Sequence, residues 1–322
     1  MDALELARAN LLSPMVLAFA LGLAATLLRS DLKLPDALYD TLSVYLLLAI
    51  GLKGGAEPSL TPWRALLGPA LATLALGVGI PLWCYAILRR LGRFGVADAA
   101  ALAAHYGSVS AVTFIACLGF LDKAGVAYEG FMPALVALLE APAIVVALGL
   151  ARLALPREGG WGEVLHELLT GKSIVLLVGG LLIGWVSGKP GVAAVAPLFM
   201  DLFKGALVLF LLEMGLITAR RFRDLARVGP FLLAFAVVMP VLHGLLGVVL
   251  GRVAGLSLGG ATVLAVLAAS SSYIAAPAAV RIALPEANPS LYLTASLAVT
   301  FPFNLALGLP LYYQLARAVY GG

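Results

Sequence analysis

The sequence predicts an all-α polytopic membrane protein in which ten transmembrane helices form two inverted five-helix repeats. The first observation is composition: 62% of the 322 residues are hydrophobic, 12% are charged, and the mean hydropathy is +1.04. A soluble domain carries about 25% charged residues, so this chain has too few polar groups to cover a water-facing surface. The second observation is a series of long apolar runs, and the third is a matched spacing of motifs in the two halves.

The apolar runs have the length that a membrane-crossing helix requires, about 20 residues. Helices are expected because lipid offers no hydrogen-bond partners to open strand edges. The runs are also continuous, whereas barrel strands alternate over about ten residues. The ten predicted spans cover residues 12–29, 37–52, 64–89, 97–120, 131–154, 172–188, 199–218, 229–252, 258–282 and 290–316.

The connections carry positive charge unequally. With ten spans, 13 Lys and Arg residues lie on the side opposite to the termini and 8 on the same side as the termini. Cytoplasmic loops hold the excess of Lys and Arg, so both termini are expected outside the inner (plasma) membrane. The clusters at 89–93 and 220–227 account for most of the difference. Asp2 and Glu5 precede Arg8, which is unlike a signal peptide, so the first run is expected to remain as a span.

The longest connection divides the chain into a first repeat, 1–154, and a second repeat, 172–322. The loop at 155–171 is expected to be cytoplasmic and to contain a short amphipathic helix. Ser108 follows Gly51 by 57 residues, and Ser272 follows Gly215 by 57 residues. Since each half has five spans, the halves enter the membrane in opposite orientations. Inverted repeats of this kind build a binding site near the membrane midplane.

Two stretches place small and hydroxyl-bearing residues inside apolar runs. They are Gly107-Ser108-Val109-Ser110-Ala111-Val112-Thr113 and Ala269-Ser270-Ser271-Ser272-Tyr273-Ile274-Ala275-Ala276-Pro277. Proline tends to kink or break a helix, and a break at membrane depth persists only where protein or a cavity satisfies the freed groups. Broken-helix N-termini would suit a small oxyanion. The alternative is close helix packing through small residues.

Charges inside the spans are a further indication of function. Glu140 and Glu213 lie in mid-span, where a carboxylate is costly and commonly marks an ion pathway. The alternative for each is a protonated or hydrogen-bonded acid near an interface. His105, directly before the first stretch, is interpreted as a structural hydrogen-bonding residue in preference to a proton relay. The glycines of Gly51-Leu52-Lys53-Gly54-Gly55 are interpreted as a turn after the second span.

The sequence offers no chemistry for an enzyme. Ser108 and Ser110 are not in a G-x-S-x-G pattern, no H-E-x-x-H zinc motif occurs, and no Walker A sequence occurs. Cys84 and Cys117 both lie in apolar runs and are interpreted as small core residues, so neither a disulfide nor a metal framework is expected. A net charge of +4 does not indicate nucleic acid, because the arginines lie in short loops. No cofactor is expected other than a sodium ion.

Five segments in chain order resemble the SbtA-type sodium-dependent bicarbonate transporters. They are GLKGG at 51–55, GSVSAVT at 107–113, LEAP at 139–142, SLGGATVLAVLAASSS at 257–272 and LPEANPSLYL at 284–293. The last two are long and specific. The resemblance implies a core domain with two broken, crossing helices, a gate domain that mediates assembly of a homotrimer, and an elevator-like movement. It also implies a PII-like regulatory protein as a partner.

The resemblance further implies which residues hold the solutes. Bicarbonate or a similar small anion would contact Gly107, Ser108, Ser110, Thr113, Ser271 and Ser272, and the coupling cation would contact Glu140, Ser270 and Tyr273. The family pattern has Asp where this chain has Tyr273, Gly where it has Ala276, and in cyanobacterial members Asp where it has Glu140. The central loop is also shorter than in those members.

These departures leave the coupling ion and the anion open. A carboxylate is a natural ligand for a hard cation, whereas tyrosine is neutral at pH 7. The leading prediction is sodium-coupled bicarbonate uptake. The alternatives are transport of another anion, coupling to protons through Glu140 or His105, and a membrane sensor that binds a ligand without transport.

Overall fold

The computed structural model describes residues 3–56, 63–155 and 161–321. Helices make up almost all of these residues, and no strand occurs among them. In chain order they are α1 (Ala3–Leu11), α2 (Pro14–Leu27), α3 (Asp36–Ala56), α4 (Trp63–Arg90), α5 (Val96–Gly107), α6 (Ala111–Ala124), α7 (Met132–Ala154), α8 (Trp161–Leu169), α9 (Lys172–Ala194), α10 (Phe203–Arg221), α11 (Leu225–Val253), α12 (Leu258–Ala269), α13 (Ala275–Ala283), α14 (Pro289–Leu293), α15 (Phe301–Phe303) and α16 (Leu309–Tyr320).

Helices lie at all ten segments where the apolar runs predict spans. Seven helical segments of the described chain are long and apolar enough to cross a membrane, and α5 and α6 together count as one of them. The helices α2 and α12 are apolar but shorter. The helix α10 has Arg220 and Arg221 in its last turn. The chain is therefore a multi-pass helical membrane protein, while the number of ten crossings stays a prediction.

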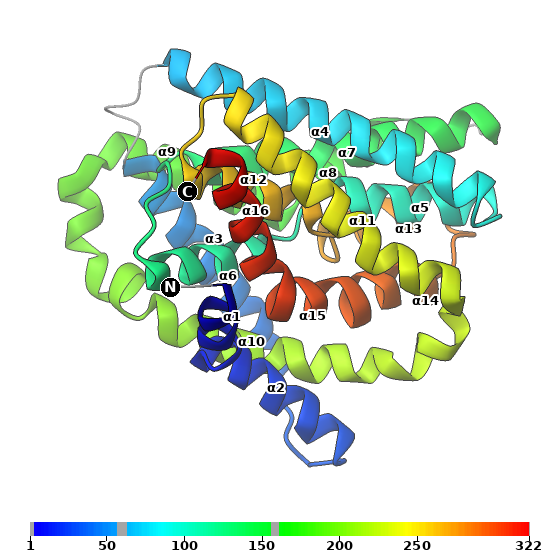
Figure 1. Ribbon diagram of the computed structural model, residues 1–322, viewed down its shortest axis with the longest axis horizontal. Coiled ribbons are helices and arrows are strands. Elements are labelled where there is room, and N and C mark those ends of the chain that lie inside the picture. The colour runs from blue at the N-terminus through cyan, green and yellow to red at the C-terminus, as the bar shows by residue number, and fades with distance from the viewer. Residues whose placement is uncertain (1–2, 57–62, 156–160, 322) are drawn as a thin grey trace.

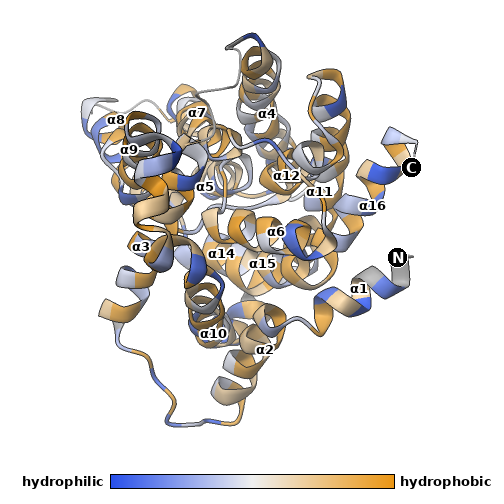
Figure 2. Cartoon of the chain, turned by 90° about the vertical axis from the view of Figure 1, so that its left-hand side faces the viewer, coloured by the Kyte–Doolittle hydropathy of each residue, from blue (hydrophilic) through white to orange (hydrophobic). Residues whose placement is uncertain are grey.

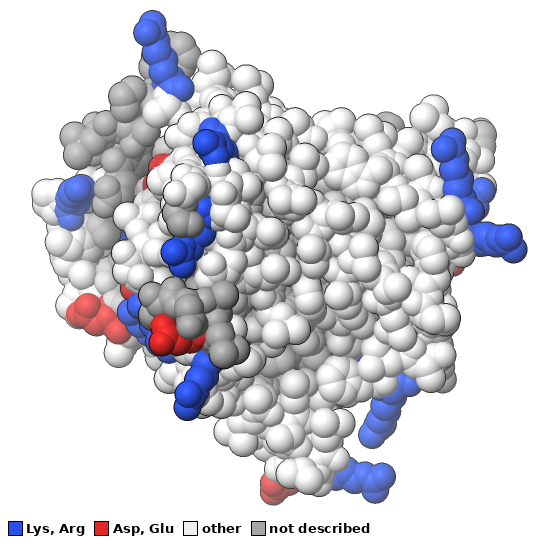
Figure 3. Space-filling view, in the orientation of Figure 1, with Lys and Arg blue, Asp and Glu red and all other residues white. Residues whose placement is uncertain are grey.

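The two ends of the molecule differ in what they carry. Both termini lie at one end, and the turns between α4 and α5 and between α10 and α11 lie at the other (Figure 1). On the face drawn in Figure 3, Lys and Arg side chains gather toward the two ends and the surface between them is almost free of charge. Termini at one end agree with an even number of crossings. Which end faces the cytoplasm stays a prediction.

Two helix pairs are held together by glycines. A Cβ atom on Gly51 of α3 would lie 2.8 Å from the Cα of Gly180 in α9, and one on Gly215 of α10 would lie 3.0 Å from the Cα of Gly22 in α2. Glycine therefore allows these backbones to approach closely, as small residues do in membrane helix packing. The prediction of a turn at 51–55 is wrong: these residues are helical, because α3 continues to Ala56.

The connection between the halves contains a helix, as predicted. The helix α8 covers Trp161–Leu169, and its Thr170 neighbour donates a hydrogen bond to the carbonyl of His166 (2.7 Å). Residues 156–160 of the predicted loop lie outside the described residues.

Viewed from the end that carries the termini, α6, α14 and α15 lie near the centre, with α9 and α10 toward the outside (Figure 2).

The centre of the fold is formed by the two interrupted helices. Of an 18-residue apolar stretch in α5 and α6, 94% is buried inside the protein, whereas 17% of the corresponding stretch in α9 is buried. The helix α5 packs against α13, and α6 packs against α12. Each half of one interrupted helix therefore lies beside the opposite half of the other. This crossing brings both interruptions to the same place.

Candidate functional site

The first interruption separates α5 from α6 at residues 108–110. Ser110 caps α6: its Oγ accepts hydrogen bonds from the backbone N–H of Thr113 (3.2 Å) and from Thr113 Oγ1 (3.0 Å). Ser108 Oγ donates to the backbone carbonyl of Glu140 in α7 (3.0 Å). A helix end leaves backbone groups without partners, and Ser is among the preferred N-cap residues. The hydroxyl groups thus stabilise a break in a buried place.

The second interruption separates α12 from α13 at residues 270–274. Ser272 Oγ accepts a hydrogen bond from the N–H of Ala276 (3.2 Å) in the first turn of α13. At the other side of the break, Asn304 Nδ2 donates to the carbonyl of Ala269 (2.9 Å), the last residue of α12. Pro277 is the third residue of α13, where a missing N–H is tolerated. The break therefore lies before the proline.

The two interruptions are joined by two hydrogen bonds. The backbone N–H of Ser110 donates to Ser270 Oγ (3.0 Å), and the backbone N–H of Ser272 donates to the carbonyl of His105 (2.8 Å). Ser270 Oγ also donates to the carbonyl of Leu267 (2.8 Å). Backbone groups freed by one break are thus satisfied in part by the other. The two serine-rich stretches form a single structural unit.

A small cavity lies where α6 and α13 begin. It measures about 10 Å³ and is lined by Val109, Ser110, Ala111, Val136, Glu140, Ser173, Tyr273 and Ile274. Ala111 is the first residue of α6, and Ile274 directly precedes α13. Helix N-termini present free N–H groups and a partial positive charge, which attract anions. The volume is about that of one water-sized sphere, so the cavity is very small.

Two polar side chains of the cavity have an atom without a hydrogen bond to any described residue. The side chain of Glu140 is 4% exposed, and its Oε2 has no partner. The hydroxyl of Tyr273 lies near Ser110 but makes no hydrogen bond of good geometry. The Tyr273 ring packs edge-on against Phe301, with 5.6 Å between ring centroids. Buried polar atoms are nearly always paired, so these two are available to a ligand.

The structure divides the predicted site residues into two groups. Ser110, Glu140 and Tyr273 line the cavity. The other six surround it: Gly107, Ser108, Thr113, Ser270, Ser271 and Ser272. Most of their polar groups are engaged within the protein, as the hydroxyl of Ser271 is with Ser296 Oγ (2.7 Å). A Cβ on Gly107 would lie 2.8 Å from Pro81 Cδ and 2.9 Å from Ala143 Cβ, so Gly107 packs against α4 and α7. The roles of all nine stay predictions.

Sequence reasoning missed Ser173 and Asn304. Ser173 lines the cavity from the start of α9, 5% exposed, and a lone serine at a helix start resembles an ordinary capping residue. Asn304 joins the carbonyl of Ala269 to the hydroxyl of Tyr312, which donates to Asn304 Oδ1 (2.8 Å). A single asparagine in an apolar run of the final helix was the only available indication, since polar residues inside spans are rare.

His105 and Glu213 lie apart from the cavity lining. His105 Nδ1 is 2.6 Å from the carbonyl of Ala101, one turn earlier in α5, and its ring lies tilted against that of Tyr292 with 4.4 Å between centroids. This contact agrees with a structural role. Glu213 is buried in α10, close to Tyr39 of α3. Within the described residues, no three His, Cys, Asp or Glu side chains are grouped as a metal site. A hard cation would instead find oxygen ligands at Glu140 and the neighbouring hydroxyl groups.

Comparison with known proteins identifies the family of this chain. A family model described as the Na⁺-dependent bicarbonate transporter superfamily matches residues 14–317, which is most of the chain. The match includes both interruptions, every residue that lines the cavity, and all of the helices from α2 to α15. No curated protein matches the chain.

Proposed function

The chain belongs to the Na⁺-dependent bicarbonate transporter superfamily, and we propose that the joined helix interruptions of this secondary transporter hold the bicarbonate ion. The observation that carries the proposal is the cavity bordered by the N-termini of α6 and α13. Both helices direct their partial positive charge toward it, and Ser110 adds a hydroxyl group. A small monovalent oxyanion matches this chemistry, because each oxygen can accept hydrogen bonds from N–H and O–H groups.

The size of the cavity supports a change of shape during transport. A space of about 10 Å³ holds one water molecule, and bicarbonate has four heavy atoms. The ring of Tyr273 borders this space, so its movement toward Phe301 or the separation of α6 from α13 would admit the anion. An elevator-like movement of a core domain relative to a gate domain would then carry the bound anion across the membrane.

Glu140 is the proposed ligand of the coupling cation. Glu140 lines the cavity, its Oε2 has no hydrogen-bond partner among the described residues, and Ser173 lies beside its side chain. Sodium would balance the carboxylate, and the partial positive charges of the two helix N-termini would then oppose the charge of the bound anion. Tyr273 contributes a neutral oxygen, and Ser270 retains one free lone pair after its two hydrogen bonds. Proton coupling is the second candidate, because the same carboxyl group can carry a proton.

The contacts between helices support two inverted repeats. If the first half of the chain is superposed on the second, α2 corresponds to α9 and α3 corresponds to α10. The α2–α10 contact then corresponds to the α3–α9 contact, and both are built on glycine pairs. The same superposition relates the packing of α4 on α5 to that of α11 on α12. We infer that residues 1–154 and 172–322 are the repeats, connected by the loop at 155–171.

The proposed core contains α4 to α7 and α11 to α16, and the proposed gate contains α2, α3, α9 and α10. The apolar surface of α9 supports a homotrimer assembled through the gate, since only 17% of its 18-residue apolar stretch is buried within one chain. A PII-like protein would bind from the cytoplasmic side, at the loop that contains α8. Chemical cross-linking in native membranes tests the trimer, and a monomer alone would contradict it.

Uptake of radiolabelled bicarbonate into proteoliposomes tests the proposed function. Uptake that rises with an inward sodium gradient is expected. Uptake that follows a proton gradient and ignores sodium would favour the second candidate. Absence of uptake under both gradients would contradict bicarbonate transport by this chain.

A further inference from the structure

Two cavities flank the C-terminal half of α6, at the end of the molecule that carries the termini. One measures about 320 Å³ and lies between α6, the α1–α2 region and α10. The other measures about 570 Å³ and lies between α3, α6, the start of α7 and α10. Lys204 of α10 lines both. We call the two cavities together the vestibule.

The vestibule is positively charged. Its lining contains Lys53, Lys123 and Lys204 against Asp122, which gives a formal charge of +2. Lys123 Nζ donates to the carbonyl of Ala9 (2.8 Å), and Lys53 Nζ donates to the hydroxyl of Tyr128 (3.4 Å). These partners are neutral: burial, together with the charge of Asp122, raises the pKa of Tyr128. Within the lining, the three lysine charges are therefore opposed only by Asp122, whose carboxylate accepts a hydrogen bond from the hydroxyl of Tyr128 (3.1 Å).

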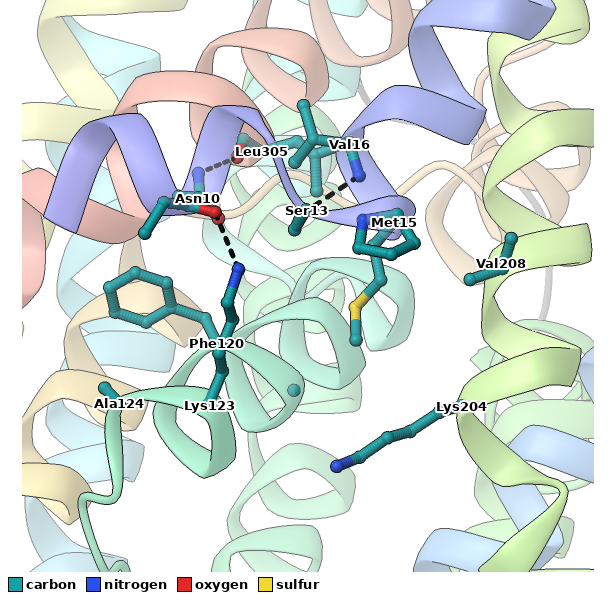
Figure 4. A pocket seen from close by; sticks show the side chains of 13 residues that line it. Asn10, Ser13, Met15, Val16, Phe120, Lys123, Ala124, Lys204, Val208 and Leu305 are labelled. Atoms are coloured by element: carbon teal, nitrogen blue, oxygen red, sulfur yellow. Dashed lines mark hydrogen bonds between the residues drawn. The ribbon is translucent and has the colours of Figure 1, made fainter. Parts of the chain in front are cut away.

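Lys204 is the cation of this group without a partner. Among the described residues it makes no hydrogen bond or ion pair, and its side chain extends from α10 into the cavity opposite Lys123 (Figure 4). Membrane topology does not explain its position. If the termini lie outside, all three lysines belong to the side that the positive-inside rule depletes of Lys and Arg. Their gathering around one vestibule indicates a role in binding.

The vestibule lies in line with the cavity between the helix interruptions. On α7, Pro133 lines the vestibule, and Val136 and Glu140 line the inner cavity. On α6, Asp122 and Leu118 line the vestibule and Ala111 the inner cavity. These spacings place the residues on one face of each helix. Seven residues of α7 span about 10 Å, so this is the separation of the two spaces along that helix.

We propose that the vestibule collects small anions and delivers them to the helix interruptions, with Lys204 as its anion-binding residue. The inference rests on the proposed function for the identity of the anion, bicarbonate. Ile50 and Leu118, which line the vestibule, and Val136, which lines the inner cavity, are all buried apolar residues. In this proposal, anions bind in the vestibule at one end of a path to the inner cavity, and the path opens when α6 and α7 move relative to α3.

Thiol labelling tests the charge of the vestibule without any transport. Val208, one turn after Lys204, lines the vestibule and is replaced by Cys, while the native Cys84 and Cys117 are fully buried. In nanodiscs of neutral phosphatidylcholine, an anionic methanethiosulfonate reagent should label V208C faster than a cationic one. The ratio of the anionic to the cationic labelling rate should fall about twofold in V208C/K204Q and stay unchanged in V208C/K204R. It should also decrease as ionic strength rises. Equal rates that ignore Lys204→Gln would overturn the proposal.

Two further measurements identify the anion. Bicarbonate should slow labelling of V208C by the anionic reagent. If this labelling slows only in nanodiscs that contain anionic lipid, the lysines bind a lipid headgroup, and the proposal is overturned. In proteoliposomes, Lys204→Gln should raise the KM for bicarbonate about twofold with unchanged maximal rate, and Lys33→Gln, near the other end of α3, should leave both unchanged. An unchanged KM for Lys204→Gln would also overturn it.

The two readouts separate the two proposals. An anion-selective labelling ratio in a protein that takes up no bicarbonate would retain the vestibule and contradict the proposed substrate. Normal bicarbonate uptake with equal labelling rates would retain the proposed function and contradict the vestibule.

Discussion

The backbone N–H of Ser110 donates a hydrogen bond to Ser270 Oγ across 3.0 Å, although 160 residues separate the two in the chain. Ser110 is the N-cap of α6, and Ser270 is the C-cap of α12. The bond joins two helix interruptions that would each expose unpaired backbone groups alone. Together with the bond from the N–H of Ser272 to the carbonyl of His105, it brings the N-termini of α6 and α13 to one cavity, and the first three predictions below rest on this arrangement.

Replacement of Ser110 by Leu should abolish bicarbonate uptake. The larger side chain fills the cavity, and the variant loses both the N-cap of α6 and a hydrogen-bond donor. Loss of a Ser cap costs about 1 kcal/mol of stability and overpacking of the buried site costs about 1–3 kcal/mol more, so the amount of folded variant is measured first. Ser110→Thr retains the hydroxyl and is the matched control. Radiolabelled uptake at equal amounts of folded protein checks this, and normal uptake by Ser110→Leu would place the anion elsewhere.

Replacement of Tyr273 by Asp should create or strengthen sodium dependence. The carboxylate adds a charged oxygen beside Glu140, and hard cations prefer such ligands. Tyr273→Phe is the control, because it keeps the ring that packs against Phe301 and removes only the hydroxyl. The measurement is uptake as a function of sodium concentration. A sodium response that matches the unaltered protein would show that this position does not limit cation binding.

Replacement of Glu140 by Gln should remove stimulation by the sodium gradient. The amide keeps the shape of the side chain but cannot carry a negative charge to balance a cation. Sodium-driven uptake should fall about tenfold, equivalent to about 1.4 kcal/mol of cation binding. Uptake is measured separately under a sodium gradient and under a proton gradient. If only the proton-driven component disappears, Glu140 carries a proton in place of holding sodium.

Replacement of Gly51 by Ala should destabilise the protein. The added Cβ would lie 2.8 Å from the Cα of Gly180 and 2.9 Å from the carbonyl oxygen of Leu177, which forces α3 and α9 apart. Overpacking of this kind costs about 1–3 kcal/mol. Gly179→Ala is the control on the neighbouring face of α9, where a Cβ would meet no atom within 4 Å. Thermal unfolding in one detergent compares them, and equal midpoints would contradict the close packing.

Some features of the fold could be predicted from the sequence because their causes are local. Apolar runs require helices in lipid, and helices lie at every predicted segment. The interruptions were also predictable, because serine and glycine inside an apolar run disfavour a continuous helix and supply their own capping groups. The turn at 51–55 was wrong for a related reason: glycine permits a turn, but it also permits a helix to approach Gly180 closely. The residue type alone does not distinguish these uses.

By itself, the sequence determined that this protein crosses the membrane, that two of its helices are interrupted at serines, and to which family it is similar. Only the tertiary structure decided which polar groups face the cavity. The hydroxyl of Ser271 is engaged by Ser296 and that of Ser108 by the carbonyl of Glu140, whereas Ser110, Glu140 and Tyr273 line the cavity with Ser173. A hydroxyl group bonds to whatever neighbour the fold supplies, and those neighbours come from distant helices. Its availability to a ligand is therefore a property of packing.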